Sequence, residues 1–314
     1  MKLVTYTTDG APRLGARTDD GRVVDLSRGY FAIASARGEP VTERRAEAVV
    51  PPEMVGFLEA GEPAMAAARE VLAFAAEHPD AGGPWGAKVV LDERDVRLRA
   101  PILRPPKIVG IGLNYRDHAE EQGARIPAVP LIFAKFATAI VGPGDPIVYP
   151  RITQQLDYEA ELAFVVGKRG KDIPPERALE HVAGYCVFND VTARDVQLSD
   201  RQWVRGKTVD GSAPIGPWLV TRDEVPDPGK LGIRLWLNDE LMQDSNTDQL
   251  IWDVPFLVSF LSEAFTLEPG DVVATGTPSG VGFARKPPVF MQPGDVVRVE
   301  VDGLGTLENR IVAG

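Results

Sequence analysis

The tripeptide Pro-Gly-Asp occurs three times in the chain, at residues 143–145, 269–271 and 293–295, each time just ahead of an apolar run of β-type residues. Proline presets φ at the first central position of a turn and glycine permits positive φ at the next, so each tripeptide is expected to start a strand. Other short apolar runs are also separated by Gly/Pro turns. Strands this numerous predict a sandwich, barrel or roll rather than a doubly wound sheet.

The predicted elements divide the chain into two parts. Residues 1–30 are expected to form short strands, and the alanine-rich run 63–76 is expected to form a helix. We therefore predict an α+β fold, mainly β, with a small N-terminal α+β domain and linker over residues 1–100 and a larger β-rich domain over 101–314. In the larger domain the expected strands are 108–113, 131–135, 159–167, 184–190, 215–221, 233–237, 272–275 and 296–301, and the clearest helices are 174–182 and 254–265.

Charge and hydropathy narrow the classes of partner. The net charge of −11 over 314 residues disfavours a nucleic-acid or anionic-membrane binder, because such proteins usually carry a basic surface. A local cluster of cations or one divalent metal ion can still attract a small anionic substrate. No apolar run reaches the roughly 18 residues of a membrane span, and a cytoplasmic location is the default expectation. The single cysteine, Cys186, excludes an intramolecular disulfide and is interpreted as a buried core thiol.

Two glutamates separated by one residue give the strongest local signal, within Asp-Tyr-Glu-Ala-Glu-Leu at residues 157–162. Alternate residues of a strand share a face, so Glu159 and Glu161 are expected to point the same way. Next to so apolar a strand the pair is costly unless it is solvated or binds a cation, and oxygen ligands suit Mg²⁺, Ca²⁺ or Mn²⁺. Asp190, which closes another apolar strand, is either a helix N-cap or the third carboxylate of a metal site.

Three further segments carry residues suited to acid–base chemistry or to anion binding. His118 and Glu121 are three residues apart on a short predicted helix, close enough for a dyad that deprotonates water, although a lone histidine is more often structural. Lys207 is either a surface lysine or part of a Gly-rich loop pinned near a site. The helical turn after Asp190 places Arg194 and Gln197 on one side. The Gly/Thr-rich turn at 274–282 can hold a carboxylate but lacks the lysine of a phosphate-binding loop.

Taken in order, these segments resemble the catalytic domain of the fumarylacetoacetate-hydrolase family. The motifs are Gly-x-Asn-Tyr-x-x-His, Asp-Tyr-Glu-x-Glu-Leu, Asn-Asp-x-Thr-Ala-Arg-Asp-x-Gln, Gly-Lys, Gln-Asp-x-Asn-Thr and Thr-Gly-Thr-x-Ser-Gly-Val-Gly. Each is weak alone, but the ordered series is highly specific and covers about residues 100–312. The N-terminal strands resemble the small leading domain of many bacterial members. The resemblance implies a mixed β-sandwich roll and a homodimer.

The resemblance also implies a role for each candidate residue. Mg²⁺ or Mn²⁺ would be held by Glu159, Glu161 and Asp190. The general base would be His118, oriented by Glu121, and Lys207 would polarise the substrate or an oxyanion with help from Arg194 and Gln197. Thr277 would bind a substrate carboxylate, and Lys135 would lie near the site entrance. One position departs from fumarylacetoacetate hydrolase itself. Ile111 stands where that enzyme has a further aspartate ligand, so this chain resembles the smaller three-carboxylate members.

The activity expected from the resemblance is metal-dependent hydrolysis of a C–C bond in a 2,4-dioxo acid of the acylpyruvate or fumarylpyruvate type. The alternatives are a 2-oxo acid decarboxylase of the oxaloacetate type and an isomerase of aromatic catabolism, because the same metal and side chains serve an enolate formed by any of these routes. A metal-independent tautomerase is a further alternative. An inactive, metal-stabilised binding or scaffold protein is the alternative from another class. No nucleic-acid or membrane partner is expected.

Overall fold

The three Pro-Gly-Asp tripeptides form the same turn. Gly144, Gly270 and Gly294 have φ values of 72°, 86° and 105°, the region that favours glycine. In each turn the aspartate carboxylate accepts the backbone N–H of the residue three positions earlier, at 2.9, 2.7 and 2.7 Å. Strands β9 (Ile147–Val148), β17 (Val272–Ala274) and β18 (Val296–Val301) follow directly. The turn-then-strand prediction is therefore confirmed at all three positions.

The computed structural model describes residues 1–314, and strands dominate it. The remaining strands are β1 (Lys2–Thr7), β2 (Arg13–Arg17), β3 (Arg22–Asp25), β4 (Val90–Asp92), β5 (Arg97–Arg99), β6 (Ile108–Gly112), β7 (Leu131–Lys135), β8 (Ile140–Val141), β10 (Leu156–Asp157), β11 (Ala160–Val166), β12 (Val182–Asn189), β13 (Thr192–Ala193), β14 (Ala213–Thr221), β15 (Gly232–Leu237), β16 (Glu240–Asn246) and β19 (Gly305–Val312). The α-helices are α1 (Leu26–Ala36), α2 (Glu43–Val49), α3 (Met54–Glu77), α4 (Arg116–Glu121), α5 (Arg194–Ser199), α6 (Val204–Lys207) and α7 (Val254–Ala264). Short 3₁₀ turns join several of them, the longest being η4 (Pro175–His181).

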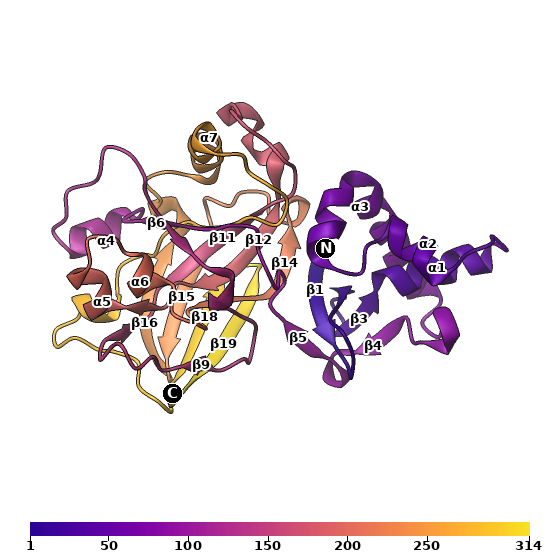
Figure 1. Ribbon diagram of the computed structural model, residues 1–314, viewed down its shortest axis with the longest axis horizontal. Helices are drawn as coiled ribbons and strands as arrows, with labels where there is room; N and C mark the ends of the chain where they lie inside the picture. The colour runs from indigo at the N-terminus through magenta and orange to yellow at the C-terminus, as the bar shows by residue number, and fades with distance from the viewer.

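One sheet of 12 strands runs through both lobes of the molecule, which lie side by side in Figure 1. Its order is β4-β3-β2-β1-β14-β12-β11-β17-β6-β7, with β5 on β1 and β8 on β14. Strand β1 of the N-terminal lobe pairs antiparallel with β14 of the larger lobe, Leu3 opposite Leu219. The predicted division near residue 100 therefore crosses a continuous sheet, and the division into two domains stays a prediction.

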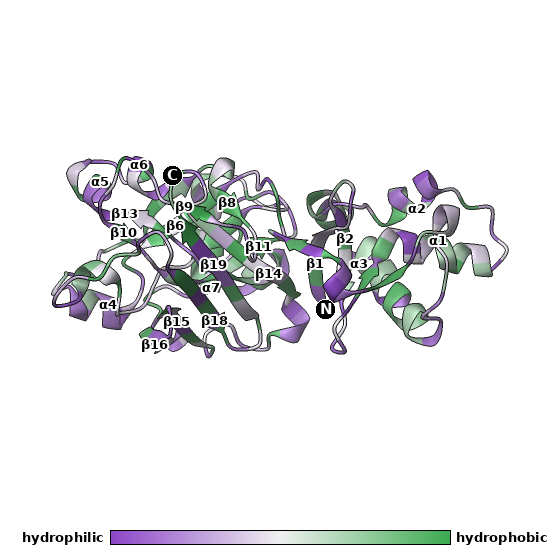
Figure 2. Cartoon of the chain, turned by 90° about the horizontal axis from the view of Figure 1, so that it is seen from below, coloured by the Kyte–Doolittle hydropathy of each residue, from purple (hydrophilic) through white to green (hydrophobic).

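A second sheet of five strands, in the order β16-β15-β18-β19-β9, packs on the larger lobe's part of the first sheet. Alternation along β11 separates two cores. Leu162 and Phe164 join the core between the sheets, while Ala163 and Val165 join a core that includes side chains of α1 and α3. In Figure 2 hydrophobic and hydrophilic residues alternate along β18 and β19. The predicted class, α+β and mainly β with a mixed sandwich roll, is confirmed.

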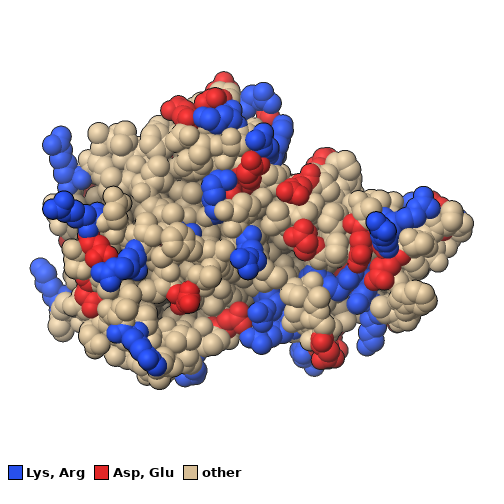
Figure 3. All heavy atoms as spheres, viewed as in Figure 1, with Lys and Arg blue, Asp and Glu red and all other residues tan.

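Of the two predicted helices, one is confirmed and one is revised. Helix α7 matches the predicted helix 254–265 to within a residue, whereas the predicted helix 174–182 is the 3₁₀ helix η4. Strands β16 and β19 were not predicted, because charged residues on their solvent faces hide the apolar alternation. No helix is long and apolar enough to cross a membrane. On the face shown in Figure 3, acidic and basic side chains intermingle around both lobes.

Candidate active site

Three carboxylates meet where strand β11 begins and β12 ends. The two strands are antiparallel with Ala160 opposite Asn189, so Glu159 and Glu161 lie beside Asp190, the residue after β12. One oxygen from each carboxylate lies within 4.8 Å of the others. All three residues are at most 5% exposed. The structure thus brings together the three residues that the sequence nominated as metal ligands.

The charges of this carboxylate triad are not balanced by the protein alone. Burial and the neighbouring Asp190 and Glu159 raise the pKa of Glu161 well above its usual range. Burial would also raise the pKa of Glu159, but Lys207 and Arg194 outweigh it and hold that pKa below its usual value. A buried carboxylate without a cation costs free energy, and a divalent ion removes that cost. An all-oxygen donor set suits a hard ion, so the triad fits a divalent metal.

Two buried lysines flank the triad. Lys207 Nζ donates to Glu159 Oε2 at 2.7 Å and to Asp190 Oδ2 at 2.6 Å. Lys135 Nζ donates to Asp190 Oδ1 at 2.6 Å and to the carbonyl of Val191 at 3.2 Å. The Lys135 side chain is fully buried, so its expected position at the site entrance is wrong. It faces inward because Lys135 lies on the same buried face of β7 as Phe133. The Asp190 carboxylate offsets the cost of burying its charge.

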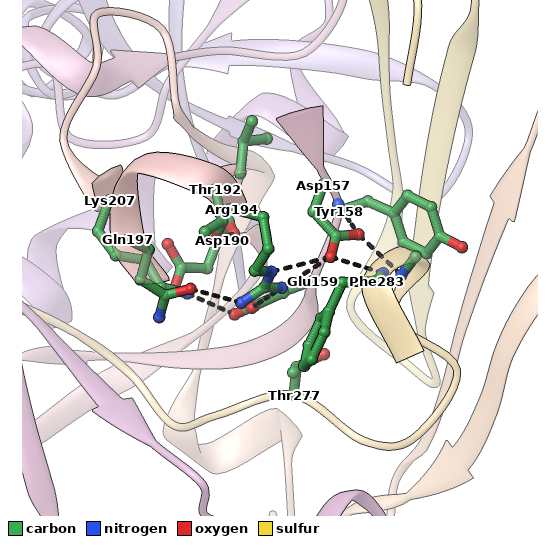
Figure 4. Close-up of polar contacts among 12 residues, drawn as sticks. Asp157, Tyr158, Glu159, Asp190, Thr192, Arg194, Gln197, Lys207, Thr277 and Phe283 are labelled. Carbon is green, nitrogen blue, oxygen red and sulfur yellow. Dashed lines mark hydrogen bonds and ion pairs between the residues drawn. The ribbon is translucent and has the colours of Figure 1, made fainter. Parts of the chain in front are cut away.

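Arg194 uses its guanidinium entirely on neighbouring side chains, as Figure 4 shows. It donates through Nε and one terminal nitrogen to Asp157 Oδ2, at 3.0 and 2.9 Å, and through the same terminal nitrogen to Glu159 Oε1, at 2.6 Å. The other terminal nitrogen donates to Gln197 Oε1 at 2.7 Å. Arg194 and Gln197 therefore share one side of α5, as predicted. Because Arg194 occupies the oxygen of the Gln197 amide, the amide nitrogen remains available as a donor to a ligand.

Asp157 is a residue that the sequence reasoning did not select. Its carboxylate is completely buried and, besides Arg194, accepts the backbone N–H groups of Gly282 at 2.8 Å and Phe283 at 3.1 Å. The Phe283 ring stacks 4.3 Å from the Arg194 guanidinium. Asp157 thus ties the Gly/Thr-rich turn to the arginine beside the triad. Its position at the head of the Asp-Tyr-Glu motif was the only available signal.

The predicted His–Glu pair is present on α4. His118 Nδ1 lies 3.3 Å from Glu121 Oε2, and the Gln122 amide nitrogen lies 2.6 Å from His118 Nε2. An amide nitrogen can only donate, so this contact requires an unprotonated Nε2, and Nδ1–H then donates to Glu121. In this tautomer the basic nitrogen of His118 is Nε2. Gln122, which the sequence reasoning did not select, occupies that nitrogen.

A cavity of about 200 Å³ joins these groups. Its polar wall includes His118, Gln197, Lys207 and Thr277 together with both glutamates of the triad. Apolar side chains, among them Ile111, close the rest. Ile111 is buried and lines the cavity with an apolar side chain, so this position supplies no fourth carboxylate. The cavity can hold a small acid with its oxygens toward the polar wall.

Comparison with known proteins places the chain in a family. The fumarylacetoacetate (FAA) hydrolase C-terminal family matches residues 107–312, and the chain belongs to this family of enzymes. It is 44% identical to the mitochondrial oxaloacetate tautomerase fahd2 of Xenopus laevis over 317 aligned residues, which cover 99% of this chain and 90% of that protein.

Solved structures of the family are also similar over the whole chain. A fumarylacetoacetate hydrolase from psychrophilic Exiguobacterium antarcticum has a TM-score of 0.79 and 36% identity, with all of both chains covered. Maleylpyruvate hydrolase from Sphingobium sp. SYK-6, in complex with manganese(II) and pyruvate, has a TM-score of 0.74 and 28% identity, again with all of both chains covered. The family predicted from the motifs is therefore confirmed, and catalysis of the family's general kind with it.

Proposed function

We propose that the protein is a divalent-metal-dependent enzyme that interconverts the keto and enol forms of oxaloacetate or a closely similar 2-oxo dicarboxylic acid. The observation that carries the proposal is the 44% identity across 99% of the chain with an oxaloacetate tautomerase. C–C hydrolysis, the activity expected first from the motifs, becomes the second candidate. The cofactor we propose is Mg²⁺ or Mn²⁺, since a structural relative is described with manganese(II) and the triad fits such an ion.

The proposed chemistry assigns proton transfer to the His–Glu pair. When bound at the triad, the metal ion supplies Lewis-acid polarisation of a 2-oxo acid, which acidifies the adjacent C–H bond. His118 Nε2 then takes a proton from C3 of the acid, and Glu121 stabilises the imidazolium through Nδ1–H. The proton returns to the 2-oxo oxygen to complete the enol, or to C3 in the reverse direction. The Lys207 ammonium stabilises the negative charge that develops between these two steps.

Contacts on the base constrain how a substrate enters. Gln122 holds His118 Nε2 at 2.6 Å, so the base becomes available only when the Gln122 side chain swings away. Helix α4 is tied to the Gly/Thr-rich turn through Glu121 Oε1, which accepts the N–H of Gly280 at 2.9 Å. We expect residues 114–127, which include α4, to act as a lid that moves when substrate binds. The cavity of about 200 Å³ is below the roughly 300–1,000 Å³ of sites for drug-sized ligands, which favours a small acid.

The experiment follows enol absorbance of oxaloacetate with and without Mg²⁺, Mn²⁺ or EDTA. The expected result is a chelator-sensitive acceleration of keto–enol equilibration without release of pyruvate or CO₂. Formation of pyruvate and CO₂ instead would make the protein a decarboxylase. Equal rates with EDTA would support the metal-independent tautomerase and contradict the role of the triad.

C–C hydrolysis remains a candidate because of the similarity to maleylpyruvate hydrolase over the whole chain. The same base can also deprotonate a water molecule. A panel of acylpyruvates and fumarylpyruvate, with products identified by mass, tests this activity. Cleavage of any of them to pyruvate and an acid at a rate above that of oxaloacetate tautomerisation would make hydrolysis the principal activity.

Replacing His118 by glutamine tests the base in either reaction. Positioned acid–base catalysis contributes about 10²–10⁴-fold, so H118Q should lose that much in kcat while its affinity for Mn²⁺ stays within about twofold of wild type. The reason is that His118 contacts Glu121 and Gln122 but no member of the triad. Decarboxylation of oxaloacetate requires no proton abstraction and should fall less than tautomerisation or hydrolysis. Equal losses in all of these reactions would exclude His118 as the base.

We also propose that the chain forms a homodimer through an apolar face beside the site. Phe136, Ile152 and Leu198 are 57%, 50% and 69% exposed. The first two line a hollow of about 1,080 Å³, which also carries side chains of both charge signs, so a second copy of the chain can offer opposite charges to them. Sedimentation of the wild type and of a Phe136→Asp/Ile152→Asp variant tests this proposal. A monomeric wild type, or a double variant that stays dimeric, would contradict it.

A further inference from the structure

Gln243 lies in the Gln-Asp-x-Asn-Thr motif on β16, and the chemistry proposed above makes no use of it. The side chain is 1% exposed. Its Oε1 accepts the backbone N–H of Ala160 at 2.9 Å, and its Nε2 donates to Thr277 Oγ1 and to the carbonyl of Pro278, both at 2.9 Å. The backbone N–H can only donate and the carbonyl can only accept. The amide of Gln243 therefore fits in one orientation, with its nitrogen facing Thr277.

This orientation fixes the polarity of the Thr277 hydroxyl. Since Thr277 Oγ1 accepts a hydrogen bond from Gln243, its own proton must go to a different acceptor. No protein atom accepts this proton, and Gln243 is the only group that forms a hydrogen bond with the hydroxyl. Thr277 also lines the 200 Å³ cavity. A hydroxyl proton that has no acceptor within the protein suits an anionic oxygen in the cavity.

We propose that Gln243 is a positioning residue, which holds the Thr277 hydroxyl as a hydrogen-bond donor for a carboxylate of the substrate. The inference rests on the proposed function in one respect, the acidic nature of the substrate. The selectivity follows from the fixed polarity. A ligand that presents an acceptor oxygen to Thr277 satisfies the hydroxyl proton, and one that presents an N–H or O–H there leaves that proton without an acceptor.

The variant Gln243→Glu reverses this polarity with little change of shape. One carboxylate oxygen still accepts the N–H of Ala160. The other faces Thr277 as an acceptor, so it draws the hydroxyl proton away from the cavity. Gln243→Met removes the hydrogen bonds without adding a charge and serves if the buried glutamate prevents folding. The same amide-to-acid change at Gln249, whose amide donates only to Asp248, is the matched control.

The test is calorimetric titration of the Mn²⁺-loaded protein with oxalate, an unreactive acid that carries carboxylates alone. Q243E is expected to weaken oxalate binding about tenfold, and Q243M less, with Mn²⁺ affinity within about twofold of wild type and Q249E unchanged. Thr277→Val should weaken oxalate to a similar extent. In the T277V background Q243M should have no further effect, because both act through the same hydroxyl.

Kinetics with oxaloacetate provide a readout that general disruption does not mimic. A contact made equally in the ground and transition states changes KM and leaves kcat unaltered, so Q243E should raise KM with kcat within about twofold. Additive effects of Q243M and T277V on oxalate, or loss of Mn²⁺ binding in Q243M, would overturn the proposal. If wild type fails to tautomerise oxaloacetate while oxalate binding still depends on both residues, the proposed function fails and this inference stands.

Discussion

Each lobe of the molecule buries carboxylate, and the two lobes treat it differently. In the N-terminal lobe Asp25 is fully buried and accepts from Tyr6 Oη and Arg13 Nε, both at 2.6 Å, and from the backbone N–H of Arg28 at 2.9 Å, which caps α1. One carboxylate there has a complete set of donors. In the larger lobe the carboxylate triad holds three acids together, and Glu161 keeps a raised pKa.

The difference distinguishes a structural charge from a functional one. Asp25 is neutralised within the fold, so the lobe is complete without a ligand. The triad has two lysines and an arginine around it, yet none of them contacts Glu161, whose only hydrogen-bond donor is the backbone N–H of Gly276 at 2.9 Å. A site for a cation is therefore recognised by the charge that the surrounding protein leaves unpaired rather than by the burial of acids alone.

The largest expected effect is loss of the metal on removal of one carboxylate from the triad. Asp190→Asn keeps the shape of the side chain but removes its charge. Changing groups outside a metal's ligands already costs about 10–100-fold in affinity, so the loss here should be at least about 100-fold, with activity lost in parallel. Calorimetric titration with Mn²⁺ measures it, and circular dichroism checks the fold. An Asp190→Asn variant with full metal-dependent turnover would contradict the site assignment.

A smaller effect, on stability instead of binding, is expected at Asp25. Asp25→Ala leaves Arg13 and Tyr6 without their partner, and breaking a buried ion pair costs about 3–5 kcal/mol. The free energy of unfolding in urea should fall by this amount, while Mn²⁺ affinity of the folded protein stays unchanged. If instead Asp25→Ala impairs metal binding in protein that remains folded, the two lobes do not differ as described.

The smallest expected effect is a dependence of stability on pH that comes from Glu161. A carboxyl group whose pKa is higher in the folded than in the unfolded chain binds its proton more tightly when folded. In the metal-free protein the contribution of Glu161 to stability should therefore fall as the pH rises from the usual value near 4.5 toward the raised pKa of Glu161, by about 1.4 kcal/mol per pH unit.

Glu161→Gln should remove that contribution and raise the Tm of the metal-free protein at neutral pH. Metal-loaded wild type should lack the same slope, because the bound ion replaces the proton. Thermal unfolding of both proteins with EDTA, from pH 5 to 8, measures the difference. Identical slopes in the two metal-free proteins would show that Glu161 is not the unpaired charge.

The sequence predicted those parts of the site that depend on local spacing. The alternation in Glu-x-Glu placed Glu159 and Glu161 on one face, and the three-residue spacing paired His118 with Glu121. Contacts between distant segments were out of reach. The pairing of Lys135 with Asp190 spans 55 positions and that of Asp157 with Gly282 spans 125, and no periodicity encodes either.

The same limit explains the errors in the fold. Lys135 lies on the buried face of β7, but a lysine on an expected strand predicts a solvent-exposed position unless a buried partner is known. Strand β19 carries Glu308 and Arg310 on its exposed face and was missed although Leu307 and Ile311 alternate with them in the core. Turn chemistry was the most reliable signal, because Pro-Gly-Asp acts within four residues.

The pairing of β1 with β14 has a consequence for the order in which the chain can fold. Leu3 lies opposite Leu219, so the strand made first waits for a neighbour made much later. At ribosomal rates of about 5–20 residues per second, that interval is roughly 10–40 s. During it, β2 can pair along one edge of β1, and β5 can pair with Thr5–Thr7 on the opposite edge. The first part of that second edge, at Lys2 and Leu3, presents unpaired backbone groups that can recruit a strand of another chain. Newly made N-terminal lobes therefore carry an aggregation hazard that the finished protein does not.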